Sequence, residues 1–106
     1  MPKYLFHGPY TEQGLKGVLK DGGTKRSQQI KQAVESLGGR LEAIYFAFGD
    51  DDFYFIADLP NNVSAITGSL ISNASGTVRL KTTVLITPEE IDEAVKKTMQ
   101  WHPPGQ

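Results

Sequence analysis

The chain has 106 residues, which is enough for one domain that buries a single hydrophobic core without disulfide bonds or a structural metal. It contains no cysteine, and this excludes disulfides, thiolate metal sites, iron–sulfur clusters and cysteine nucleophiles. With 11 lysines and arginines against 12 aspartates and glutamates, its net charge of -1 does not favour nucleic acid or an anionic membrane as a partner.

The N-terminal part predicts a strand followed by an interrupted helix. Residues Lys3–Thr11 are rich in aromatic side chains that alternate along the chain, as in a strand. Apolar residues at helical spacing follow Thr11, until Gly22 and Gly23 interrupt the pattern. The helix resumes with Thr24 as its N-cap and stops at Gly38.

The remainder predicts three strands, two helices and a tail. Turn residues and periodicity place a hairpin of strands at 40–48 and 53–59, a helix from Pro60 to Gly76, a strand at 78–86, a helix from Thr87 to about Gln100, and an extended tail at 101–106. Thr87, Pro88 and two acids make a strong helix start. We expect a single domain over residues 1–106 with no repeat.

This order of elements is typical of an α+β fold. A β-α-β-β-α-β sequence predicts a ferredoxin-like antiparallel sheet with helices on one face, here with an added C-terminal helix. In strand 40–48 an unbroken alternation sets Leu41, Ala43 and Tyr45 on one face and Ile44 and Phe46 on the other. Each large apolar side chain removed from water contributes roughly 1.5–3 kcal/mol. The two apolar faces therefore predict a homodimer or higher oligomer that covers the bare sheet face.

Several stretches resemble the GYD domain family, namely "YTEQGLKG", "ESLGGRLEAIYFAFGDDDFYFIADLPNN", "SGTVR" and "TPEEIDEA". The resemblance runs from about Lys3 into the tail. It implies a dimeric α/β barrel, in which two subunits pack sheet against sheet, and a ligand cleft between sheet and helices. It implies no particular activity. In the family's Gly-x-Tyr-Asp element Gly49 and Asp52 match, but Asp51 stands at the Tyr position, so no role of that Tyr carries over.

The three consecutive aspartates, Asp50 to Asp52, invite a metal or an acid/base assignment. A calcium or magnesium site needs about six oxygens, and adjacent side chains point in different directions. We therefore predict a solvated turn at the hairpin tip, in which Gly49 supplies a positive φ and the carboxylates bond turn amides. Asp52 is the best candidate for a specific role, either capping the hairpin or bonding across the dimer.

His7 is the first candidate for a reactive group. It lies in the first strand, on the face opposite Tyr4 and Phe6, and imidazole suits acid–base catalysis. The alternative is a hydrogen-bonded structural histidine. The only other histidine, His102, lies in the Pro-rich tail, and neither has carboxylates at ligand spacing, so we expect no metal and no cofactor.

Three tyrosines on the predicted sheet are candidates for orienting a ligand. Tyr10, Tyr45 and Tyr54 carry hydroxyls among apolar neighbours, as in many small-molecule sites. The alternative is that their hydroxyls lie at the rim of the core or of an interface.

Two arginines are candidate anion-binding groups. Arg26 falls in the first turn of the resumed helix, where the helix dipole disfavours cations, and a bound anion would relieve that conflict. It is otherwise an ordinary exposed residue. Arg79, with Lys81, is the second candidate; in an edge strand these cations would instead guard against unwanted pairing.

Two functions are compatible with the sequence. The first is an oligomeric protein that binds a small organic ligand in an apolar cleft. If that protein is an enzyme, we predict cofactor-independent chemistry with His7 as acid/base and Tyr45 or Tyr54 orienting the ligand. The second is a non-enzymatic binding or scaffold module without a ligand cleft. No apolar run has the length of a signal peptide core or a membrane span, so we expect a cytoplasmic protein.

Overall fold

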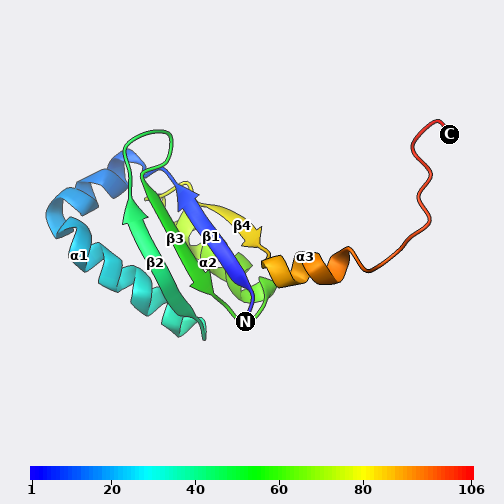
Figure 1. The fold of residues 1–106 in the computed structure, drawn as a ribbon. Coiled ribbons are helices and arrows are strands. Elements are labelled where there is room, and N and C mark those ends of the chain that lie inside the picture. Colours follow the sequence, from blue (N-terminus) through cyan, green and yellow to red (C-terminus); the bar gives the residue numbers. More distant parts are fainter.

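The computed structural model describes residues 1–106 as one four-stranded sheet with two helices behind it (Figure 1). The elements are β1 (Lys3–Gly8), α1 (Glu12–Ser36), β2 (Arg40–Phe46), β3 (Phe53–Asp58), α2 (Asn62–Ala74), β4 (Lys81–Leu85) and α3 (Pro88–Ala94). The strand order is β2-β3-β1-β4, and every pairing is antiparallel. This confirms the α+β class and agrees with the ferredoxin-like arrangement predicted from the sequence.

The helix starts follow from local side-chain bonds. Thr11 caps α1 by accepting a hydrogen bond from the Gly14 amide, and Thr87 forms a capping box with Glu90 at the start of α3. The predicted interruption in the first helix is a kink at Gly22, whose φ of 77° glycine adopts without strain. The two helical segments are thus one bent element, and the prediction of Thr24 as an N-cap is wrong because the helix is interrupted at Gly22 and Thr24 lies inside it.

Some predicted boundaries are wrong. β1 ends at Gly8 and β2 at Phe46, and the strand predicted at 78–86 is reduced to Lys81–Leu85, with Val78 in a single bridge to Tyr10. The last helix ends at Ala94, well before Gln100. All residues beyond 94 are exposed, so no burial offsets the entropy cost of extending a short helix there.

The core lies between the sheet and α1 and α2. It contains eleven buried apolar residues: Tyr4, Phe6, Tyr10, Ile30, Val34, Phe53, Phe55, Ala57, Leu59, Ala65 and Val78. Aromatic packing across β1 and β3 is central to it, since the Phe6 and Phe55 rings stack with centroids 4.9 Å apart. The helices therefore attach to the sheet through one aromatic layer.

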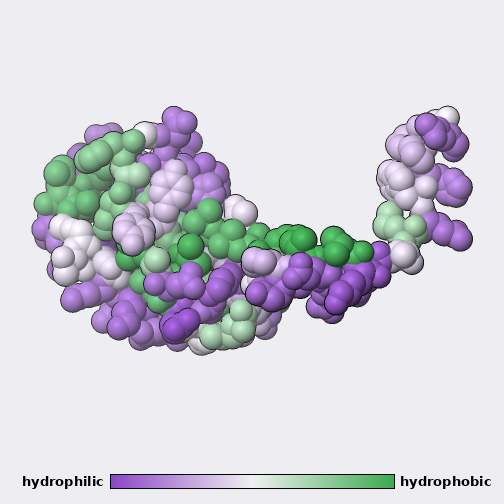
Figure 2. Space-filling view, in the orientation of Figure 1, coloured by the Kyte–Doolittle hydropathy of each residue, from purple (hydrophilic) through white to green (hydrophobic).

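The opposite side of the sheet carries no helix, and we call it the open face. The strand register groups on it Leu5, His7, Ala43, Tyr45, Tyr54 and Ile56. Leu41 was predicted beside Ala43 and Tyr45, but a β-bulge between Leu41 and Ala43 turns Leu41 toward the core instead. Hydrophobic residues gather over the middle of the sheet in Figure 2, which views this face.

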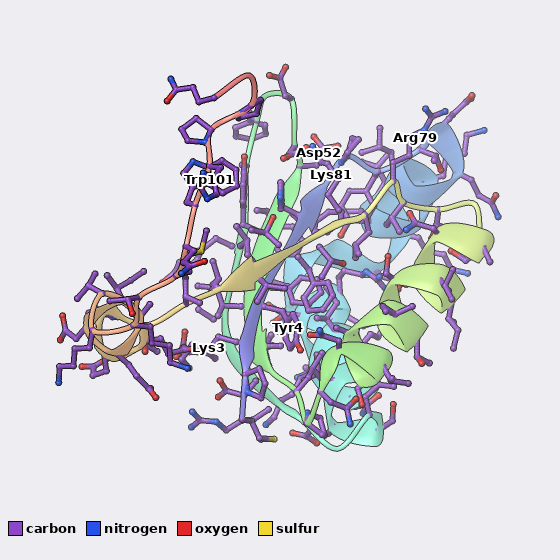
Figure 3. All side chains as sticks on the ribbon, turned by 90° about the vertical axis from the view of Figure 1, so that its right-hand side faces the viewer. Lys3, Tyr4, Asp52, Arg79, Lys81 and Trp101 are labelled. Carbon is purple, nitrogen blue, oxygen red and sulfur yellow. The ribbon has the colours of Figure 1, made fainter.

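The C-terminal segment, residues 87–106, extends away from the domain, and we call it the arm. It leaves on the open-face side of the sheet, away from α1 and α2, and Trp101 lies far out on it (Figure 3). Its large apolar residues, Ile91, Val95, Met99 and Trp101, are all exposed. The Cα radius of gyration is 17.0 Å, whereas a compact chain of this size has about 13 Å. The arm therefore finds no packing partner within its own chain.

Leu59 offers a test of the core. It is 1 % exposed, so Leu59→Ala should lower the free energy of unfolding by about 2–5 kcal/mol, because it removes buried methyl groups and leaves a cavity. Leu19→Ala is the matched control, since Leu19 is 87 % exposed and should change stability by less than about 0.5 kcal/mol. Urea denaturation followed by circular dichroism measures both; equal effects would contradict this core assignment.

Candidate functional site

A small cavity lies within the core, between the sheet and both helices. Its volume is about 110 Å³, and 11 of its 15 lining residues are hydrophobic. Phe6, Phe53 and Phe55 line it from the sheet, Val34 from α1, and Gly68 from α2. Interiors are usually packed without voids larger than a water molecule, so a cavity of this size is an unusual feature of a small domain.

Few polar groups border the cavity. Tyr10, Arg26, Gln29 and Ser72 supply them. The Arg26 Nη1 group donates a hydrogen bond to Gln29 Oε1 at 3.2 Å, and no carboxylate lies within ion-pair distance of Arg26. The Tyr10 hydroxyl is buried and has no hydrogen-bond partner. The cavity thus combines an apolar wall with an arginine that has no ion pair and a tyrosine hydroxyl that has no hydrogen-bond partner.

A second cluster, centred on Asp51, lies on the open face. Asp51 is only 7 % exposed. One carboxylate oxygen, Oδ2, lies 2.7 Å from His7 Nδ1, and the other, Oδ1, accepts from Lys81 Nζ at 3.0 Å. The hydrogen bond from His7 and then that from Lys81 hold the pKa of Asp51 below its usual range, despite burial. Asp51 is therefore a carboxylate that joins the hairpin loop to β1 and β4.

The hydrogen bond to Asp51 determines which nitrogen of the His7 ring is the donor. An ionised carboxylate only accepts hydrogen bonds, so His7 Nδ1 is the donor, and in a neutral ring Nε2 is left as an acceptor. Nε2 lies 3.5 Å from Thr83 Oγ1, a long contact. The ring stacks on Tyr54 with centroids 5.7 Å apart and an interplanar angle of 2°. This arrangement orients an imidazole so that one nitrogen can take up a proton.

The prediction of a solvated turn is wrong for Asp51. Asp50 is exposed, but Asp51 is buried, because His7 and Lys81 supply two hydrogen-bond donors for its carboxylate. Asp52 accepts from the Tyr10 amide at 3.0 Å, which ties the loop to the end of β1. Gly49 has a φ of 156°. Adjacent aspartates therefore have three different environments.

A second ionic group, which the sequence analysis did not predict, lies at the other end of the sheet. Lys3 Nζ lies 2.8 Å from Asp58 Oδ1, and Arg40 Nη2 lies 3.1 Å from Asp58 Oδ2. The Lys3 hydrogen bond is the main reason that the pKa of Asp58 is lowered. Both contacts cross between neighbouring strands, so this group pins the register of β1, β2 and β3.

The structure divides the predicted site residues among three places. Tyr10 and Arg26 border the cavity, whereas His7, Tyr45 and Tyr54 share the open face. The prediction that His7 acts on a ligand in the cleft between sheet and helices does not fit this arrangement, because His7 and the cavity lie on opposite faces of the sheet. Arg79 borders neither; it lines a shallow surface groove between the loop after β1 and the end of α2.

Some residues of these sites were missed by sequence reasoning. Gln29 lies one helical turn after Arg26, a spacing that predicts contact between them. Lys81 was considered only as an edge or anion residue, yet it pairs with Asp51 across 30 positions, and no local pattern signals such a contact. No group of three or more His, Asp or Glu side chains is arranged to hold a metal ion, and no helix has the length and apolar character needed to cross a membrane.

Comparisons with known proteins bear on family and fold. The sequence model of the GYD domain matches residues 4–95. A search of curated proteins found no significant match. Among solved structures, the chain is similar to the crystal structure of MtbAldR, with a TM-score of 0.62 and 15 % identity over 97 % of this chain. The aligned region spans 59 % of the MtbAldR chain, and at this identity the likeness shows the fold alone.

The Asp51 cluster predicts a pH dependence of stability. A carboxyl whose pKa is lowered on folding contributes stability above its unfolded value of 3.8, and this is lost as pH falls through the folded value. Asp51→Asn should lower the melting temperature at neutral pH and flatten its fall below pH 4. Asp50→Asn is the control, since Asp50 is exposed and makes no ion pair. Identical acid profiles for Asp51→Asn and the wild type, by calorimetry, would contradict this role.

Proposed function

The chain belongs to the GYD domain family, and we propose that it is a homo-oligomeric protein that binds a small organic molecule in the cavity between its sheet and helices. The single observation that supports ligand binding is the cavity itself, of about 110 Å³. An apolar wall with a small number of polar groups is the usual composition of a small-molecule site. Ligand pockets for drug-sized molecules are larger, about 300–1,000 Å³, so the proposed ligand is a small one.

The packing around the cavity supports this proposal. The aromatic rings on one side belong to the best-buried part of the sheet, with Phe6 at 3 % and Phe53 at 2 % exposure. Collapse of the walls would require these rings to move together with α1. A cavity bounded by such a rigid layer keeps its shape when empty, and a preformed site loses little free energy to ordering when a ligand binds.

Ala33 allows the cavity to be blocked without disturbing the core. It lines the cavity from α1 yet is exposed, so Ala33→Trp should fold and reduce the space available to a ligand. We expect butanamide, a neutral molecule small enough for the cavity, to shift the methyl NMR signals of Ile30 and Val34 saturably in the wild-type protein, and to bind at least about tenfold more weakly to Ala33→Trp. Gln32→Trp is the control, because Gln32 is the exposed neighbour that does not line the cavity. Equal shifts in both variants would refute binding in this cavity.

The proposed oligomer is a dimer in which a second copy covers the open face. Tyr45 is 73 % exposed and Tyr54 40 % exposed on this face, with Leu5 and Ile56 only partly covered between them. An apolar patch of this kind on a monomer usually marks an interface. The arm, which leaves on the same side of the sheet, presents a further apolar edge along α3 (Figure 2). A second copy seated on the open face would meet both surfaces, and closing two sheets in this way is the barrel predicted from the sequence.

Tyr45 and Val63 form a matched pair for testing the dimer. They are almost equally exposed, at 73 % and 71 %, but Tyr45 is on the open face and Val63 is on α2 behind the sheet. Light scattering at micromolar concentration should give twice the chain mass of 11.6 kDa for the wild type and for Val63→Asp. Tyr45→Asp should raise the dimer dissociation constant at least about tenfold, because a buried charge would be unpaired. A monomeric wild type would refute the dimer.

Acid–base catalysis by His7 stays a prediction, and the contact between His7 and Asp51 favours it. Its Nδ1 bond to Asp51 is the arrangement that prepares an imidazole to accept a proton at Nε2. Catalysis there would take place on the open face, beneath a second copy, and not in the cavity. A non-enzymatic module remains the alternative function, and it is the one favoured if the cavity binds no small molecule.

A further inference from the structure

We infer that the cavity takes a small monocarboxylate, with its carboxylate at Arg26 and its hydrocarbon body against the aromatic wall. This inference rests on the proposed function, since it names the class of ligand for the same cavity. It is carried by four observations: the unpaired arginine, the unpartnered tyrosine hydroxyl, the break in α1, and the volume and apolar lining of the cavity.

Arg26 is the only cation among the lining residues, and no acid is among them. Of the three arginines in the chain, Arg40 pairs with Asp58 at 3.1 Å, whereas Arg26 and Arg79 form no ion pair, and of these two only Arg26 lines the cavity. The guanidinium carries five N–H donors in a planar fork, and one of its N–H groups goes to Gln29. The Gln29 bond holds the side chain in place while the remaining donors stay available. A carboxylate is the ligand group whose geometry matches that fork.

The Tyr10 hydroxyl supplies a second donor of the right kind. Tyr10 lines the cavity and is 9 % exposed, and its hydroxyl is buried without a partner. Buried polar groups in folded proteins nearly always have a partner, so an unsatisfied one in a cavity wall calls for an explanation. A carboxylate oxygen accepts from both a phenol and a guanidinium, whereas an amine ligand would be repelled by Arg26.

The kink in α1 makes the same position favourable for an anion. Gly22 leaves helical geometry, so the segment after it begins a new run of helix, and Arg26 lies in its first turn. The positive end of a helix disfavours a cation and stabilises an anion within one turn. An anion bound to Arg26 would satisfy both the guanidinium and this helix end, which resolves the conflict noted in the sequence.

The remaining wall limits the rest of the ligand. Eleven hydrophobic residues surround about 110 Å³, whereas an apolar cavity of about 150 Å³ accommodates benzene. The ligand therefore has no more than about six non-hydrogen atoms, the number in butanoate. A second charge would have to lie against Phe6 and Phe55, where burial without a partner is costly, so dicarboxylates and phosphate esters are disfavoured.

Butanoate and butanamide test whether the cavity prefers a negative charge, because they have the same size and differ in charge. NMR titrations of the methyl signals of Ile30, Val34 and Val78 should give at least about tenfold tighter binding of butanoate than of butanamide to the wild type. Arg26→Gln should remove this preference while leaving butanamide binding unchanged. Tyr10→Phe should weaken butanoate several-fold with no loss of folding, since the hydroxyl bonds nothing in the protein.

Lys25→Gln is the matched control. Lys25 is the adjacent cation in the same helical turn, but it pairs with Asp21 and does not line the cavity, so both titrations should be unchanged. Equal affinity of the wild type for both probes would overturn the carboxylate class and leave the proposed function standing. Binding of neither probe would overturn the proposed function as well. Butanoate preference that survives Arg26→Gln in a protein with a wild-type spectrum would overturn the assignment of the carboxylate to Arg26.

Discussion

The alternation of side chains along β1 decides where every candidate group lies. This strand is hydrogen-bonded to β3 on one side and to β4 on the other, so its two faces cannot exchange without breaking both ladders. Tyr4 and Phe6 point into the core, and His7 points to the open face. A single strand thus separates the cavity from the Asp51 cluster by the thickness of the sheet, and any chemistry at one is distinct from binding at the other.

The Asp51 cluster shows how a loop residue becomes part of the fold. Its carboxylate contacts β1 through His7 and β4 through Lys81, so three segments far apart in the chain meet at one buried charge. A tyrosine, which the family signature has at this position, has no ionised oxygen at neutral pH to offer Lys81. In this chain Asp51 therefore adds a negative charge to the open face, and the hydrogen bonds from His7 and then Lys81 lower its pKa.

The distribution of apolar side chains gives the molecule two unequal surfaces. The apolar layer on one side of the sheet is covered by α1 and α2 and forms the core. The apolar side chains on the open face and along α3 stay exposed. Burial of apolar area is the main favourable term in folding and association, so both uncovered surfaces are sources of association free energy. The arm and the open face lie on the same side of the sheet (Figure 3), and a second copy of the chain is the partner that would use both at once.

The sequence by itself determined the order of the elements, the α+β class, the family and the capped start of α3. Each of these depends on local spacing or on bonds between near neighbours, such as the capping box of Thr87 and Glu90. Only the tertiary structure decided that Asp51 is buried, that Leu41 turns inward at a bulge, and that Arg26 and Tyr10 border one cavity. These depend on contacts between distant positions and on register shifts of one residue, which leave no periodic mark in the chain.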